Sequence, residues 1–449
     1  EAMLPLVSQA LDRAIAWRTG RRYPQHLAQY RAMERWTPEA FEAWRWERLR
    51  AQLDHAARTV PYWRETFARL GARPADFTRP EHLAALPATT KERINAAGDA
   101  MTSTQPEPGR VTRSSTGGST GRNVWFLIDG EAHDRRRAAG RLTEEWDRVR
   151  PGTRTATIWG ASLEQNPSRG AALYDRLTNR VFLSAYGVGP SELDAYAERL
   201  LRLRPEVISS YPSILLDLAR RWGRDLCRRL GVRIIYCSAE ALFEPVRAEL
   251  EDLFGAVVRN RYACREFGMV AADCPLGGGL HLMDMRLFVE ALPTAEDPEL
   301  RELVITDLDN RVMPLLRYRI DDLARPARGS CRCGRPFARM ESIEGRVLDV
   351  VTTPDGRSFG GTFFTLVLRP FDRSIRQFQV VQDRPDHLLV RLVPGPGYDG
   401  AARERVREVL AGTFGPALAV ELREVDEIAP LASGKRRFVI RDLGRDERR

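Results

Sequence analysis

Residues 232–262 read VRIIYCSAEALFEPVRAELEDLFGAVVRNRY. The apolar runs at 232–238 and 257–262 have the length of buried strands, and residues 245–253 between them carry apolar side chains at helical spacing. This stretch therefore predicts a strand, a helix and a second strand, which is the unit that builds layered α/β domains.

The same alternation extends toward the N-terminus. It predicts further strands at 124–128, 154–159 and 207–210, and further helices at 132–148, 191–203 and 213–222. The first 100 residues differ and are predicted to be mostly helical, because residues 39–58 carry Trp44, Trp46, Leu49 and Leu53 at helical spacing. We expect a large N-terminal α/β domain with several layers and largely parallel sheets.

Toward the C-terminus, residues 280–292 and 302–307 are predicted to be strands linked by a polar turn. From about residue 347 the pattern is that of a small α+β domain, with strands expected at 375–381, 387–393 and 418–423 and a helix at 401–410. We place the boundary at Gly345-Arg346, which gives an N-terminal domain of residues 1–345 and a small mobile domain of residues 346–449.

The length and composition agree with this division. At roughly 100–200 residues per domain, a chain of 449 residues predicts more than one domain. No apolar stretch approaches the roughly 18 residues of a membrane span, and residues 1–4 lack the layout of a secretory signal. We therefore expect a globular cytoplasmic protein that binds no membrane.

The basic character of the chain has two interpretations. The net charge of +9 suits a nucleic-acid partner, but the arginines are spread along the chain and interleaved with acids, as in Arg135, Arg136 and Arg137 ahead of Glu144 and Glu145. Nucleic-acid binders gather their charge on one face. A solvated charged surface is the favoured interpretation, with no nucleic-acid partner.

Lysine is almost absent from this arginine-rich chain. Lys and Arg total 70, and the lysines are Lys91 and Lys435. A compact ammonium on a flexible stem can approach a reacting oxygen as a point charge, which a guanidinium does less well. Each lysine is thus a candidate for a role that arginine cannot fill, although chance explains either one alone equally well.

Residues 116–121 read TGGSTG and follow no packing period. Glycines let the backbone approach an anion, and amides and hydroxyls donate to phosphate oxygens. Arg122 stands where a Walker loop needs Lys. Taken alone, such a segment is more often a flexible surface loop.

Several segments together resemble the adenylate-forming superfamily, and within it the phenylacetate–coenzyme A ligase and CapK-like branch. The resemblance covers nearly the whole length. The segments that carry it are VPYW at 60–63, LPATTK at 86–91, TGGSTG at 116–121, SAE at 238–240, YACRE at 262–266, YRIDD at 318–322, GRVLD at 345–349 and PLASGK at 430–435.

The resemblance implies ATP and Mg²⁺ as cofactors and assigns residues to them. The phosphate loop would be Thr116, Gly117, Gly118, Ser119, Thr120 and Gly121. Ser238, Ala239, Glu240 and Tyr262 would line adenine, Asp322 would bind the ribose and Glu266 would hold Mg²⁺, with Arg265 and Arg346 near the nucleotide. Asp349 would be the pivot about which the small domain rotates, and Lys435 the catalytic lysine.

The chain departs from the family at three places. Arg265 stands where the family has Thr or Ser, Ala263 where it has Gly, and Arg122-Asn123 where Lys-Pro is more common. A guanidinium beside Glu266 could pair with it and weaken metal binding, or it could clamp a phosphate. Both alternatives stay open.

Six cysteines are present, and four side chains form a candidate metal site. Cys274 and His281 flank a glycine-rich turn, and Cys331 and Cys333 form a second close pair. Three thiolates and one imidazole would complete a structural zinc site, while reduced thiols in ordinary loops remain the alternative. Cys227 and Cys237, in apolar surroundings, are expected in the core.

The implied reaction is ATP-dependent activation of a carboxylic acid to an acyl-adenylate, followed by capture by a thiol. Coenzyme A is the favoured acceptor. An aromatic acid is the favoured substrate, because family position puts Trp159, Tyr186 and Tyr211 around the acid, although aromatic residues at strand ends are core residues at least as often.

Other functions stay open. They are amide formation with an amine acceptor, an adenylyltransferase that leaves AMP on its substrate, and a non-catalytic nucleotide-binding scaffold. A homodimer also stays open.

Overall fold

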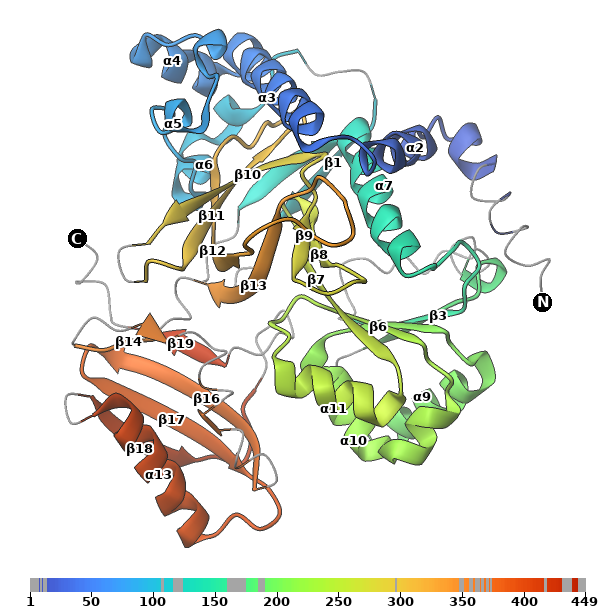
Figure 1. The fold of residues 1–449 in the computed structure, drawn as a ribbon, viewed down its shortest axis with the longest axis vertical. Helices are drawn as coiled ribbons and strands as arrows, with labels where there is room; N and C mark the ends of the chain where they lie inside the picture. The colour runs from blue at the N-terminus through green and yellow to red at the C-terminus, as the bar shows by residue number, and fades with distance from the viewer. Residues whose placement is uncertain are drawn as a thin grey trace.

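The computed structural model describes residues 8, 10, 14–105, 109–115, 124–159, 175–184, 190–294, 297–346, 351–354, 358–359, 364, 367–368, 371, 374–415, 418–429 and 438–442. Their strands form an 11-stranded sheet, a four-stranded sheet and two two-stranded sheets. Figure 1 shows the four-stranded sheet at the lower left, beside the large N-terminal part. The predicted α/β fold with a small C-terminal α+β unit is confirmed.

One half of the 11-stranded sheet is parallel. It contains β3 (Thr155–Trp159), β4 (Arg180–Ser184), β5 (Val207–Ser210), β6 (Ile234–Ser238) and β7 (Val257–Cys264), in the order β7-β6-β5-β3-β4. Helices α9 (Pro190–Leu203), α10 (Pro212–Arg229) and α11 (Glu244–Phe254) lie against this half (Figure 1). Residues 234–237 of β6 are buried, as expected of a strand covered on both faces. The strand–helix–strand prediction for residues 232–262 is confirmed.

The other half of the sheet is antiparallel, so the prediction of largely parallel sheets was wrong here. It contains β8 (Gly268–Asp273), β9 (Leu280–Leu282), β10 (Leu287–Pro293), β11 (Arg301–Asp307), β12 (Tyr318–Pro326) and β13 (Arg339–Arg346), in the order β10-β11-β12-β13-β9-β8. No helix lies between successive strands along residues 268–294 and 297–346. Turns and loops therefore replace the crossover helices that parallel pairing requires.

The single strand predicted at 280–292 is two strands. The amides of Arg286 and Leu287 both donate to the carbonyl oxygen of Met283, each at 3.0 Å, and this turn separates β9 from β10. β9 then pairs with β8 and β13, whereas β10 pairs with β11. Both strands are buried where they meet the turn, and residues 283–286 of the turn are buried too, so burial continues across it.

The N-terminal region is helical, as predicted. Its elements are α2 (Tyr23–Met33), α3 (Pro38–Thr59), α4 (Pro61–Leu70), η1 (Pro74–Asp76), α5 (Pro80–Leu83), α6 (Lys91–Ala97), η2 (Gly98–Met101), β1 (Val111–Ser115), β2 (Trp125–Asp129) and α7 (Gly130–Trp146). α3 begins where the Thr37 side chain accepts a hydrogen bond from the Ala40 amide at 3.2 Å, with Pro38 in the first turn. Its apolar face, with Trp46, Leu49 and Leu53, is buried in the largest core.

The C-terminal part has its own sheet and core. Strands β16 (Ile375–Arg384), β17 (His387–Pro394), β18 (Ala419–Glu424) and β19 (Val439–Arg441) have the order β18-β17-β16-β19, with α13 (Gly400–Phe414) packed on them and the short pair β14 (Val351–Thr352) and β15 (Ser358–Phe359) nearby. A separate apolar cluster fills the space between α13 and the sheet. The proposed domain boundary at 345–346 falls on the last two residues of β13.

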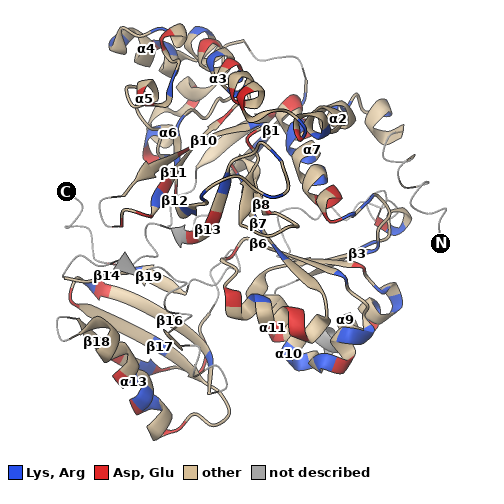
Figure 2. Cartoon of the chain, in the orientation of Figure 1, with Lys and Arg blue, Asp and Glu red and all other residues tan. Residues whose placement is uncertain are grey.

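Charged residues of both signs lie along the helices (Figure 2). Between α10 and α11, for example, Arg220 donates to Glu249 at 2.6 Å, and Arg224 pairs with Asp252. None of the described helices combines the length and the apolar composition needed to cross a membrane.

Two glycines in the turn between β8 and β9 have similar backbone angles but different surroundings, so substituting each one tests the packing of this hairpin. Gly277 and Gly279 have φ angles of 77° and 99°, which side chains rarely adopt. A Cβ on Gly277 would meet nothing within 4 Å, whereas one on Gly279 would collide with the carbonyl oxygen of Met340 in β13. We expect Gly277→Ala to cost about 1 kcal/mol of unfolding free energy and Gly279→Ala about 3 kcal/mol, measured as urea midpoints at equal metal content. Equal losses in the two variants would contradict the placement of β9 against β13.

Candidate functional site

The carboxyl ends of the parallel strands define one edge of the sheet. Trp159 ends β3, Tyr211 follows β5, Ser238 ends β6, and the turn at 265–267 follows β7. Ligands of open α/β sheets bind in the crevice beyond these ends. The structure therefore gathers at one edge several residues that are far apart in the sequence.

The predicted aromatic pocket residues Trp159 and Tyr211 are in contact. Their rings stack with centroids 4.2 Å apart and an interplanar angle of 17°. Tyr211 is buried and caps the start of α10. The third predicted pocket residue, Tyr186, lies outside the described residues.

The predicted adenine segment makes a strained turn at the end of β6. Ala239 has φ of 69°, in the left-handed region that a residue with a Cβ rarely adopts. The Ser238 hydroxyl donates to the carbonyl oxygen of Arg261 at 2.6 Å, and Glu240 accepts from the Ser213 amide at 3.3 Å. These bonds hold the turn in its strained form, and strain of this kind clusters at functional sites.

Tyr262 and Asp322 meet between β7 and β12. The Tyr262 hydroxyl donates to Oδ2 of Asp322 at 2.5 Å. Burial, and then the charge of Asp322, raise the pKa of Tyr262, so its hydroxyl keeps its proton. Asp322 also stands opposite Arg346 in the β12–β13 register. Predicted adenine and ribose residues thus form one connected group.

Glu266 lies in the turn between β7 and β8 and is 7% exposed. The hydroxyl of Tyr318 donates to Oε1 of Glu266 at 3.1 Å. Burial, and then the charge of Glu266, raise the pKa of Tyr318. Over the described part of the chain, no basic side chain pairs with the Glu266 carboxylate. A nearly buried carboxylate with only a neutral partner fits a site for a divalent cation.

Arg265 does not pair with Glu266, which was one of the two alternatives for this departure. Its guanidinium donates to the carbonyl oxygen of Ser115 at 3.1 Å. Ser115 ends β1, directly before the predicted phosphate loop. Arg265 therefore ties the Glu266 turn to the strand that leads into this loop.

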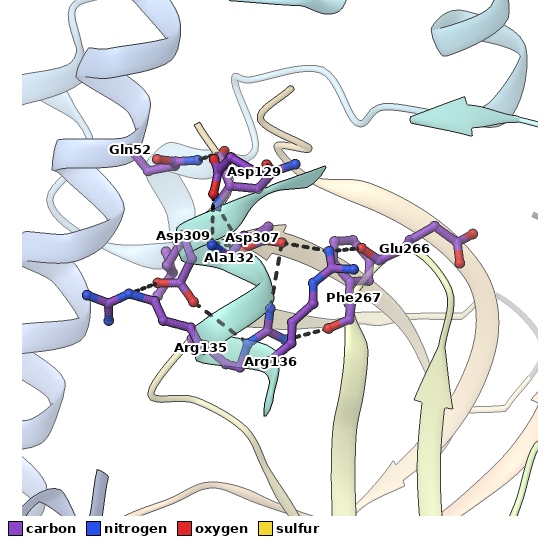
Figure 3. Close-up of polar contacts among 12 residues, drawn as sticks. Gln52, Asp129, Ala132, Arg135, Arg136, Glu266, Phe267, Asp307 and Asp309 are labelled. Atoms are coloured by element: carbon purple, nitrogen blue, oxygen red, sulfur yellow. Dashed lines mark hydrogen bonds and ion pairs between the residues drawn. The ribbon is translucent and has the colours of Figure 1, made fainter. Parts of the chain in front are cut away.

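Arg135 and Arg136 are not part of the solvated surface that the sequence favoured, whereas Arg137 is exposed. The side chains of Arg135 and Arg136 are 13% and 11% exposed, and both reach carboxylates that are almost fully buried. Arg135 lies 3.6 Å from Asp309, and Arg136 lies 3.3 Å from Asp307 (Figure 3). The strand–Asp–Leu–Asp pattern at 303–309 was the available signal for buried acids, but their basic partners come from a distant helix.

The predicted metal ligands converge. The ligand atoms of Cys274, His281, Cys331 and Cys333 all lie within 4.8 Å of one another. His281 Nε2 is 3.1 Å from Cys333 Sγ, and Cys274 Sγ is 3.6 Å from Cys331 Sγ. This arrangement has the number and kind of ligands of a tetrahedral zinc site.

His281 is prepared as a ligand. Its Nδ1 lies 3.2 Å from the carbonyl oxygen of Phe337, which can only accept, so Nδ1 carries the proton and Nε2 is left to bind a metal. Burial lowers the pKa of His281 to about 4 and keeps it neutral. By contrast, Cys227 and Cys237 are fully buried core residues, as predicted.

Lys91 has a partner that the sequence did not indicate. Its Nζ lies 2.7 Å from Oδ2 of Asp321, the neighbour of Asp322. Asp321 has φ of 64°, and the amide and carbonyl of Thr89 hydrogen-bond the ends of the Arg317–Arg319 segment. The segment before α6 is therefore pinned to β12.

Several predicted residues lie outside the described part of the chain. They are Thr116, Gly117, Gly118, Ser119, Thr120, Gly121, Tyr186, Asp349 and Lys435, together with the side chain of Arg346.

Comparison with known proteins supports the resemblance. Residues 351–442 match the family model of the CapK C-terminal domain. Protein CapK of Staphylococcus aureus is 22% identical over 364 residues, which are 80% of this chain and 80% of that protein. Phenylacetate-coenzyme A ligase of Pseudomonas putida is 29% identical over 346 residues, which are 71% of this chain and 73% of that one.

A solved structure shares the fold. The 2-hydroxyisobutyryl-CoA ligase in its postadenylation state, in complex with R3-HIB-AMP, superposes with a TM-score of 0.71 at 20% identity, over 89% of each chain. The similarities confirm the resemblance that the sequence motifs indicated: this chain is similar to CapK and to phenylacetate–coenzyme A ligases.

Proposed function

We propose that this protein is an ATP-dependent, AMP-forming carboxylic acid ligase that makes an acyl-adenylate and transfers the acyl group to coenzyme A. The observation that carries the proposal is the convergence of Tyr262, Glu266 and Asp322 at the carboxyl edge of the sheet. A hydrogen-bonded tyrosine and aspartate beside a nearly buried carboxylate that has no cationic partner among the described residues suit adenine, ribose and metal-bound phosphate.

Attack of a carboxylate on the α-phosphate brings two anions together, so catalysis needs positive charge and positioning. Glu266 would hold Mg²⁺, which supplies charge neutralisation when bound. The phosphate loop, Thr116–Gly121, would contribute amide and hydroxyl donors, and Arg265 would anchor the strand before it.

Lys435 would contact both the carboxylate and the α-phosphate. Phe438, three positions later, packs on Phe243 with ring centroids 5.4 Å apart. Phe243 follows closely on Glu240, at the start of α11. This contact supports the approach of the lysine segment to the adenine side of the cleft, with Asp349 as the hinge about which the small domain turns.

The acid and the acceptor are inferred from two observations. The stacked Trp159 and Tyr211 favour a flat aromatic acid, and the names of the phenylacetate–coenzyme A ligase relatives favour the thiol of coenzyme A. An amine acceptor, which the sequence left open, is the second candidate. Retention of AMP on the substrate is the third.

Cys274, His281, Cys331 and Cys333 would hold a structural zinc ion. Their segments, the β8–β9 hairpin and the loop before β13, are already joined by the β9–β13 pairing and by hydrogen bonds such as that from Arg332 to the carbonyl oxygen of Leu276. A tetrahedral ion would cross-link them. A reduced cluster of thiols is the alternative.

Lys435→Ala is expected to lower acid-dependent ATP–pyrophosphate exchange by roughly a hundredfold, because a preorganised contact to the developing charge contributes about 3 kcal/mol. Transfer from a pre-formed acyl-adenylate to coenzyme A should be largely spared, since that step no longer needs the lysine. Arg436→Ala is the matched control and should keep exchange within about threefold.

A screen of aromatic and aliphatic acids with wild-type protein, followed by mass spectrometry, separates the candidate reactions. Free AMP with a coenzyme A thioester supports the proposal, an amide or a stable AMP conjugate replaces it with one of the alternatives, and no exchange with any acid together with no effect of Lys435→Ala excludes a ligase.

The metal proposal predicts about one zinc ion per chain after dialysis, measured by inductively coupled plasma mass spectrometry. Cys333→Ser should lose most of this zinc, because one thiolate is removed from the cluster. Cys237→Ala, at a buried cysteine outside the cluster, should retain it. Equal zinc in both variants would show that the four side chains do not hold the metal.

A further inference from the structure

Two arginines donate hydrogen bonds to the backbone of the turn that contains Glu266. Arg136 of α7 donates from Nη1 to the carbonyl oxygen of Arg265 at 3.3 Å and from Nη2 to that of Glu266. Arg286, in the turn between β9 and β10, donates from Nη1 to the carbonyl oxygen of Phe267 at 2.5 Å. All three successive carbonyls of the turn are therefore bound by guanidinium groups.

Two buried aspartates balance the charge of these arginines. Asp307 lies 3.3 Å from Arg136 and 3.8 Å from Arg286, and Asp309 lies 3.7 Å from Arg286. The side chain of Arg286 is 0% exposed, and those of the two aspartates at most 1%. Asp307 in turn accepts from the amides of Asp309 and Asn310, which orients its carboxylate.

A network of buried charges does not stabilise a core more than apolar packing does. Removing buried charges from water costs several kcal/mol per ion, and well-packed apolar residues often give equal stability. What guanidinium groups add is direction, because their planar donors fix several acceptors at once. Gly268 directly follows the turn and lies next to Arg136. Its φ is 69°, and a Cβ there would contact the Arg136 side chain at 3.5 Å.

We propose that Arg136 and Arg286 are positioning residues that fix the turn at 265–267, so that the Glu266 carboxylate is presented toward the Tyr318 hydroxyl. The guanidinium groups hold the three backbone carbonyls of the turn, and the Glu266 side chain accepts a hydrogen bond from the Tyr318 hydroxyl. The role given to Glu266 here, as a metal ligand, rests on the proposed function. The positioning itself depends only on the contacts.

The chain offers a matched control for this proposal. Arg135 is the neighbour of Arg136 on α7 and is equally buried, and it also reaches the acid pair through Asp309. Among the described residues its partners are Glu131, Asp309 and Tyr30, and it makes no bond to the turn. Arg135→Gln thus removes a buried charge from the same network but leaves the three carbonyls bound.

The experiment compares Arg136→Gln, Arg136→Lys and Arg135→Gln in the full-length protein. Hydrogen–deuterium exchange of a peptide spanning 264–268 reports the turn directly. We expect at least tenfold faster exchange in Arg136→Gln, a partial return in Arg136→Lys, and a change under threefold in Arg135→Gln. The second readout is the Mg²⁺ concentration that half-saturates pyrophosphate exchange, which should rise at least fivefold in Arg136→Gln and less than twofold in Arg135→Gln.

A purely structural role predicts a different pattern. Arg136→Gln and Arg135→Gln would then lower the melting temperature and kcat in proportion, with unchanged Mg²⁺ dependence and equal exchange at 264–268, and this result would overturn the proposal. Faster exchange at the turn with unaltered Mg²⁺ dependence would support the positioning of the turn and would overturn the role of Glu266 as the metal ligand. If wild-type protein shows no pyrophosphate exchange with any acid, the proposed function fails, and the hydrogen-exchange comparison alone decides whether Arg136 positions the turn.

Discussion

β7 is hydrogen-bonded in parallel to β6 on one side and antiparallel to β8 on the other, so the sheet changes its pairing at this strand. The switch requires a tight reversal at 265–267, directly beyond the carboxyl end of a parallel strand. A reversal exposes carbonyl groups that no ladder can satisfy, and buried carbonyls need partners. Arg136 and Arg286 supply them, and the rest of the candidate site is arranged around the turn that they hold.

Tyr262 precedes the turn and meets Asp322, Glu266 lies within it and meets Tyr318, and Arg265 reaches back to Ser115. Strand β12, which contributes Tyr318 and Asp322, is pinned in turn by the segment that ends at Lys91. The antiparallel half of the sheet therefore does more than extend the core. It brings Tyr318 and Asp322 of β12 to the edge where the parallel strands end, so that they meet Glu266 and Tyr262.

The alternating part of the fold was predictable from the sequence because each parallel strand is a short apolar run separated by an amphipathic helix. β6 and α11 show why: residues 234–237 are buried, and the helix buries Leu250 and Phe254 on one face. The antiparallel half was harder, because β9 and β10 are both buried next to the turn that separates them, and the backbone hydrogen bonds to Met283 that divide them leave no mark in the residue pattern. Local pattern cannot show such a turn when no glycine or proline marks it.

The residues of the candidate site divide in the same way. Tyr262, Glu266 and Asp322 could be named from motifs, and the cysteines from their spacing, because each lies in a short recognisable segment. Arg136 could not, since its partners lie 129 to 171 positions away in the sequence.

The scarcity of lysine drew attention to Lys91 and Lys435 and led to the abundant arginines being treated as surface charge. The structure argues for a different division of labour. Arg136 binds two carbonyls and a carboxylate with one planar group, which suits a fixed support inside the protein. Lys91, by contrast, donates to one carboxylate oxygen of Asp321. In this chain, the arginines that bear on the candidate site are the buried ones, Arg136 and Arg286.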